Sequence, residues 1–285
     1  MGTSGSYSGA GGKAGKDVTS GLGDWVNTLP TNGGSARPST TADGSDQGVP
    51  GAPQVVQLPP TVVSGLLALL RPSSGSGSGS GAGGAGMGGG GGRAAGGGAG
   101  RGGGGSVRAG SGRSTRRLSS VGGRAAAGAY AYATGDRATL GRLGLDYDTL
   151  RALNDPFEVT RQIVGAVCGP RASSTLEDAE ERYVAALVAD YVLTQRADGS
   201  PPDLDDVARY AIATIMTEVL SSELGAALNE RPDEVIAVAE SELREAANAL
   251  ASQARLTATG PTEDELSTAI ESGIETLRVI YGGSK

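Results

Sequence analysis

The chain contains no histidine, one cysteine, one phenylalanine and one tryptophan in 285 residues. Without histidine, no Ser or Cys nucleophile can be paired with an imidazole base, and the commonest transition-metal ligand is missing. The single Cys168 excludes an intramolecular disulfide and a zinc site of the usual Cys/His type. We therefore expect a protein that is not an enzyme and that has no metal or other cofactor.

Long apolar runs are also lacking. The longest, from Val62 to Leu70, is interrupted by Ser64 and Gly65 and is too short to span a membrane. The first residues have neither the charged region nor the apolar region of a secretory signal. We therefore expect a cytoplasmic protein that does not contact a membrane.

Glycine is abundant, with 50 residues, most of them before residue 136. Glycine loses much backbone entropy on folding and has no side chain to bury in return. We expect a long, Gly-rich and largely disordered N-terminal region in front of a C-terminal helical bundle, which makes the fold all-α. The expected divisions are a flexible arm with a short Trp-containing amphipathic segment (1–54), an apolar docking segment (55–72), a Gly/Ser/Arg low-complexity linker (73–123) and an acidic helical domain (124–285).

The charges are distributed unevenly along the chain. Residues 47–135 hold eight arginines and no acidic residue, whereas residues 136–285 hold 27 acidic and 13 basic residues, a net charge of −14. This contrast favours a linker that folds back on its own acidic domain or attracts a polyanion. Nucleic-acid binding by such a tract would be weak and nonspecific, because residues 73–129 contain no aromatic side chain for base stacking.

Helical spacing and helix-end signals divide the C-terminal domain. We expect helices over 125–134, 137–143, 147–153 and from Asp155 to Gly169, then four long helices that form a compact bundle. The long helices begin after a capping box at residues 174–177, at Asp203, after Pro232 and after a second capping box at residues 262–265. Tyr183 and Tyr210 are counted with the apolar faces. The acidic clusters at 177–181, 203–206 and 263–265 are interpreted as solvated helix starts rather than as Mg²⁺ ligands, and Cys168 as an inert, partly buried thiol.

Two apolar segments precede the bundle. The first suits a short helix that starts at Ser20 or Asp24 and ends at Pro30, with a disordered tail that carries a few apolar residues as the alternative. The second is expected to form a helix from Pro60 to Leu70, although helix and strand are hard to separate there. Side chains this apolar are expected to dock on a partner or on the chain's own helical domain. The predicted docking residues are Trp25, Val26, Leu29, Leu66, Leu67 and Leu70.

The start of the chain is a third candidate site. A small residue after Met1 favours removal of the initiator methionine, which exposes the α-amine of Gly2 as a nucleophile that can enter a deep pocket. The sequence also fits the loose rule for N-myristoylation, with Ser6 at the required position; the alternative is an ordinary chain start. The predicted modification or partner-binding residues are Gly2, Thr3, Ser4, Ser6 and Tyr7.

Several of these features together resemble a known family. The opening Met-Gly-Thr-Ser-x-Ser-Tyr, the segment Gly23-Asp24-Trp25, the Gly-rich stretch, the motif Gly144-Leu145-Asp146-Tyr147-Asp148-Thr149-Leu150 and the helical C-terminal domain are similar to QatB-type proteins of the bacterial Qat anti-phage defence system. The resemblance covers most of the chain but depends on short motifs.

The resemblance implies a non-enzymatic component of a defence operon that also encodes an ATPase, a QueC-like enzyme and a TatD-like nuclease. QueC-like proteins adenylate a carboxylate on a deazaguanine and deliver it to an amine, so the resemblance implies an adaptor whose Gly2 is presented to the QueC-like partner. The alternatives from other classes are a nucleic-acid-associated protein that uses the Arg/Gly tract, or a generic helical scaffold.

Overall fold

A computed structural model of the chain describes residues 13–29, 58–70, 115–169, 175–195, 199–228, 231–256 and 260–282. The regular elements in these ranges are all helices, which confirms the all-α class. The helices are α1 (Lys13–Val26), α2 (Pro60–Leu69), α3 (Thr115–Thr134), α4 (Arg137–Arg142), α5 (Tyr147–Leu153), α6 (Pro156–Cys168), α7 (Leu176–Thr194), α8 (Leu204–Leu228), α9 (Asp233–Ser252) and α10 (Glu263–Tyr281). Most of the N-terminal sequence for which disorder is expected lies outside the described residues.

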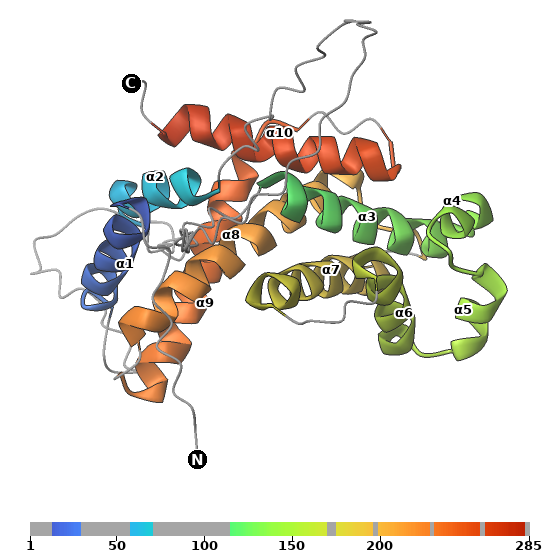
Figure 1. Ribbon diagram of the computed structural model, residues 1–285, viewed down its shortest axis with the longest axis horizontal. Coiled ribbons are helices and arrows are strands. Elements are labelled where there is room, and N and C mark those ends of the chain that lie inside the picture. The colour runs from blue at the N-terminus through green and yellow to red at the C-terminus, as the bar shows by residue number, and fades with distance from the viewer. Residues whose placement is uncertain are drawn as a thin grey trace, which may run out of the picture.

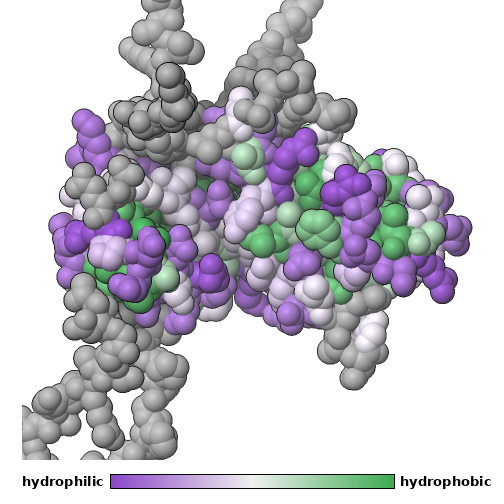
Figure 2. Space-filling model, turned by 90° about the horizontal axis from the view of Figure 1, so that it is seen from below, coloured by the Kyte–Doolittle hydropathy of each residue, from purple (hydrophilic) through white to green (hydrophobic). Residues whose placement is uncertain are grey.

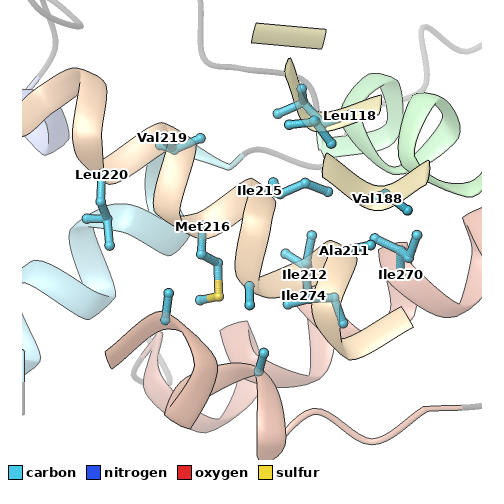
Figure 3. Packing of buried hydrophobic residues seen from close by; sticks show 14 of the residues in the cluster. Leu118, Val188, Ala211, Ile212, Ile215, Met216, Val219, Leu220, Ile270 and Ile274 are labelled. Atoms are coloured by element: carbon cyan, nitrogen blue, oxygen red, sulfur yellow. The ribbon is translucent and has the colours of Figure 1, made fainter. Parts of the chain in front are cut away.

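Helix α8 is the centre of the bundle, because it packs against α1, α3, α7, α9 and α10 (Figure 1). Its buried side chains include Ile212, Met216 and Leu220, all with 0 % exposure. In Figure 3 these residues lie among side chains from neighbouring helices, including Ile270 and Ile274 of α10. The core therefore surrounds the longest helix, and the other long helices are arranged about it.

Helices α3 and α10 lie side by side (Figure 1), and a glycine sets their distance. A Cβ atom on Gly123 would lie 2.6 Å from the backbone nitrogen of Ser267 and 2.8 Å from its Cα. A real Cβ atom essentially never lies this close to a non-bonded heavy atom, so a glycine is needed where the two backbones approach.

This contact explains why α3 begins at Thr115, ten residues before the expected start at Ala125. Residues 115–123 had the composition of the linker, but their small side chains pack against other helices. Gly122 and Gly123 are both buried, and helix packing overrides the low helix propensity of glycine and serine here.

The helix ends follow the expected signals in the middle of the chain. Asp136, Asp146 and Asp155 are the N-caps of α4, α5 and α6, and each accepts hydrogen bonds from backbone N–H groups of the first turn. Helix α6 ends at Cys168, before Gly169, which has a φ of +67°. The boundaries expected for these three helices are therefore confirmed to within one residue.

The capping box of α7 is displaced by one residue from its expected position. Thr175 and Asp178 form it, each accepting a 3.2 Å hydrogen bond from the backbone N–H of the other, instead of Ser174 and Glu177. Asp178 is buried beside Arg117 and is therefore held close to the helix start, whereas Glu177 is exposed. The N-cap of α10 is where the sequence predicts it, because the hydroxyl of Thr262 accepts a hydrogen bond from the backbone N–H of Glu265.

Each of the two N-terminal segments contains a helix, which decides between the alternatives that the sequence leaves open. Helix α1 begins at Lys13, seven residues before Ser20, and α2 has Pro60 in its first turn. None of the helices in the described ranges is both long and apolar enough to cross a lipid bilayer.

Candidate functional site

The predicted residues at the chain start lie outside the described part of the protein. Gly2, Thr3, Ser4, Ser6 and Tyr7 belong to residues 1–12, and the description begins at Lys13, the first residue of α1. The structure therefore locates the helix to which these residues are attached, and α1 becomes the relevant anchor.

The predicted docking residues lie in the core of this chain. Helices α1 and α2 pack on each other and on α8, and α2 also packs on α10. The six side chains are at most 5 % exposed: Trp25, Val26, Leu29, Leu66, Leu67 and Leu70. The sequence leaves open docking on a partner or on the chain's own domain, and the structure shows the second, because α8 and α10 supply the apolar surface on which α1 and α2 dock.

Polar contacts fix the same two helices to the body. The hydroxyl of Thr19 lies 3.3 Å from Oε2 of Glu223, a carboxylate on α8 with no exposed surface. Arg278 of α10 donates from Nε to the carbonyl oxygen of Leu67 at 3.3 Å and from Nη2 to the carbonyl oxygen of Leu70. These contacts place the C-terminal end of α2 and the middle of α1 at defined points on the bundle.

The acidic start of α7 is not a solvated helix end, in contrast to the sequence-based interpretation. Asp178, Glu180 and Glu181 are less than 9 % exposed. Arg117 of α3 pairs with Glu181 and lies 3.3 Å from Asp178. Burial of these carboxylates requires such a partner, because an unpaired charge in the core is costly. The cluster therefore joins α3 to α7.

A groove runs over α8 between α7 and α9, and we call it the α8 groove. Helices α7 and α9 both pack on α8 and lie on different sides of it (Figure 1). Its floor comes from one face of α8, and its volume is about 230 Å³. The polar and aromatic residues that line it are Tyr183 of α7, Tyr210, Thr214, Thr217, Glu218 and Ser221 of α8, and Glu240, Arg244 and Asn248 of α9.

A pair of stacked tyrosines fixes one end of this groove. The rings of Tyr191 and Tyr210 are nearly parallel, with centroids 4.1 Å apart and an angle of 9° between the planes. Burial raises the pKa of both phenols, and the nearby carboxylates of Asp206 and Asp190 raise the pKa of Tyr191 and Tyr210 respectively. Both rings are therefore partly buried and lie near negatively charged side chains.

Tyr183 lies on the wall of the groove and keeps 52 % of its surface exposed. In the floor of the groove, Thr214 is only 7 % exposed. The groove thus combines an accessible aromatic ring, hydroxyl groups and the carboxylates of Glu218 and Glu240. This combination suits a cationic or hydrogen-bonding ligand better than an apolar one.

The sequence interpretation missed the groove, because it counted Tyr183 and Tyr210 with the core-facing residues. Helix periodicity shows that they lie on apolar stripes, but it does not show which part of a stripe another helix leaves uncovered. One available signal was the run of hydroxyl side chains on α8 at helical spacing, namely Thr214, Thr217 and Ser221.

A second cavity, of about 310 Å³, lies where α2, α9 and the end of α10 meet. Leu58, Val63 and Leu250 give it apolar walls, and the hydroxyl of Tyr281 donates a 2.6 Å hydrogen bond to Gln253 at its edge. In Figure 2, which shows the molecule from below, hydrophilic residues are interspersed with smaller apolar patches. The cavity offers shape and apolar surface but no charged group to orient a ligand.

Groups for metal binding or nucleophilic chemistry are not brought together in the described ranges. No three His, Cys, Asp or Glu side chains of this part of the chain are arranged to hold a metal ion. Cys168 is a buried thiol at the end of α6.

Comparison with protein-family models, with curated proteins and with solved structures finds no match for this chain. The features that bear on its function are therefore the anchored α1, the α8 groove and the sequence motifs.

Proposed function

We propose that the protein is a non-enzymatic adaptor of a bacterial anti-phage defence system, and that a QueC-like partner enzyme binds residues 1–12. The observation that carries this proposal is the docking of α1 on the helical body. Val18 and Leu22 of α1 have no exposed surface, so Lys13 is attached to a fixed point of the bundle. The residues before it form a tethered segment that a partner can bind without disturbing the core.

The length of this segment suits insertion into an enzyme pocket. Gly2 precedes Lys13 by eleven residues, which span at most roughly 40 Å when fully extended. The residues between them are mostly Gly, Ser and Ala, with Tyr7 as the single aromatic. Small side chains let the chain enter a narrow channel, and Tyr7 offers one anchor for recognition.

The chemistry that follows is acyl transfer to the α-amine. The partner would activate a carboxylate with ATP as the acyl-adenylate and release pyrophosphate. The amine of Gly2, exposed by removal of Met1, would attack the acyl carbon, lose a proton and displace AMP, leaving an amide. In this proposal the adaptor supplies only the nucleophile, which is consistent with the lack of histidine and with the burial of Cys168.

Intact-mass spectrometry of the protein co-expressed with a QueC-like enzyme and the other operon proteins tests the proposal. We expect a mass increase on the N-terminal peptide in the wild type and in Gly2→Ala, where Met1 is still removed. Gly2→Glu is expected to retain Met1 and to show no such increase. An unmodified N-terminus in an active, complete operon would exclude the modification, and failure of the QueC-like protein to co-purify would exclude the adaptor role.

A further inference from the structure

The Gly/Arg segment between α2 and α3 is joined to the body at both ends. Leu70, at the end of α2, has no exposed surface and its carbonyl oxygen is bound by Arg278. Thr115, at the start of α3, is 2 % exposed. Between them lie 44 residues, and a glycine-rich chain of that length has a root-mean-square span of roughly 35–40 Å.

This double attachment keeps the segment close to the bundle. A folded unit of this size has a radius of gyration of roughly 16 Å, so the α8 groove is within reach of the segment. Attachment at both ends also gives the segment a high effective concentration at every surface of its own body. Even a weak contact is then favoured over the same contact with a separate molecule.

The segment has one kind of charged group. Residues 71–114 contain five arginines, no acidic residue and no aromatic, and the remainder is chiefly Gly, Ser and Ala. Arg101 is flanked by Gly100 and Gly102, so its backbone can approach a groove wall without a neighbouring side chain in the way. A guanidinium group is therefore what this segment can offer to a binding site.

We propose that the α8 groove binds arginine side chains of this chain's own segment 71–114, with Arg101 as the main occupant. The exposed ring of Tyr183 gives a guanidinium a face to stack on, and Glu240 on the opposite wall gives it a carboxylate. Hydroxyl oxygens of Thr217 and Ser221 in the floor accept the remaining N–H donors.

The charges around the groove agree with this occupant. Glu218 and Glu240 line it together with one base, Arg244, and Asp190 and Asp206 lie close enough to raise the pKa of the stacked tyrosines. Arg244 makes the groove less negative and therefore disfavours a dense cluster of guanidinium groups. The occupant therefore needs isolated arginines separated by uncharged residues, as in the segment around Arg101.

Site-specific photo-crosslinking in the full-length protein tests this inference. The photoreactive residue is introduced as Tyr183→p-benzoylphenylalanine in the groove. The matched control is Phe157→p-benzoylphenylalanine in the first turn of α6, where the wild-type ring is 74 % exposed. We expect intramolecular cross-links from position 183 to peptides within residues 93–113, mapped by mass spectrometry, and few from position 157.

The cross-link yield should respond to charge in a defined way. Arg101→Gln, Glu240→Gln or 0.5 M NaCl should each lower the yield from position 183 by roughly threefold, as expected for a partly exposed ion pair. Glu245→Gln, a change of an exposed residue on the same helix that does not line the groove, should leave it unchanged.

Two results would overturn the inference. The first is a set of cross-links confined to the helical body, with the same yield in Arg101→Gln. The second is cross-linking to a second copy of the chain or to nucleic acid in place of residues 93–113. Neither result bears on the binding of residues 1–12 by a partner, because the α8 groove and α1 are tested by different variants.

Discussion

Thr19 of α1 and Glu223 of α8 lie 3.3 Å apart, hydroxyl to carboxylate, although 204 residues separate them in the sequence. The same hydroxyl is 2.9 Å from the carbonyl oxygen of Gly15, one turn earlier in α1. Since the Glu223 carboxylate has no exposed surface, a hydrogen bond to it is worth more than one at the surface. The contact specifies where α1 sits on the body, and hence where residues 1–12 begin.

Thr19→Val removes this hydroxyl with little change of volume. We expect the free energy of unfolding to fall by about 1–2 kcal/mol, because a buried carboxylate loses a donor. Urea denaturation followed by circular dichroism measures the change. Thr19→Ser keeps the hydroxyl and should therefore keep most of the stability that Thr19→Val loses. Equal losses of stability in both variants would show that the original threonine side chain matters for a reason other than its hydrogen bond.

Leu66→Ala tests the docking of α2 on its own bundle. Leu66 has no exposed surface, and truncation of a fully buried leucine costs about 2–5 kcal/mol. The same denaturation experiment should show this loss. The matched change is Ala68→Ser, at an exposed position of α2, which should alter stability by less than about 0.5 kcal/mol. A Leu66→Ala protein as stable as wild type would mean that α2 does not pack in cis.

Two Gly→Ala substitutions should act in opposite directions. At Gly123 a Cβ would meet the backbone of Ser267, so α3 and α10 must separate, and we expect a loss of about 1–3 kcal/mol. At Gly165 in α6 nothing lies within 4 Å of the new Cβ. Here alanine should stabilise the helix by about 0.5–1 kcal/mol. Thermal unfolding of the two variants should give melting temperatures on either side of the wild-type value.

The N-cap of α4, Asp136, predicts how the stability of the fold changes at low pH. The hydrogen bonds from Thr139 hold the pKa of Asp136 below its ordinary value of 3.8. Because the folded-state pKa is lowered, the carboxylate stabilises the fold above its unfolded-state pKa, and that contribution is lost as the pH falls through the folded-state pKa. A carbon-detected NMR titration should place the midpoint of Asp136 below 3.8. A midpoint at or above this value would contradict the cap, and Asp136→Asn should abolish the signal.

The helices in the middle of the chain show which helix boundaries can be predicted from local sequence signals. Helices α4, α5 and α6 were predictable because an aspartate, a glycine or a proline marks each boundary, and these residues act through local hydrogen bonds and backbone conformation. The start of α3 was not predictable in the same way. Gly122 and Gly123 are favourable there only because α10 lies against them, and no local signal contains that information.

The candidate sites were likewise predictable from the sequence only in part. The apolar character of Trp25 and Leu66 predicted that they would be buried, but their sequence did not say in what. The α8 groove combines Tyr183, Tyr210 and Glu240 from three helices, and its existence depends on how far α7 and α9 stand apart over α8. Such a spacing is a property of the assembled bundle.

The docking of α1 and α2 on α8 and α10 has a consequence for protein synthesis. After α1 has been synthesised, about 180 further residues must be translated before α8 begins. At roughly 5–20 residues per second, that delay is on the order of 10–40 s. During this time α2 is the partner surface available to α1, and the surface of α8 has not yet been made. The burial of α1 on α8 is therefore a late event, and part of the apolar surface of α1 and α2 stays uncovered on the nascent chain until α8 has been made.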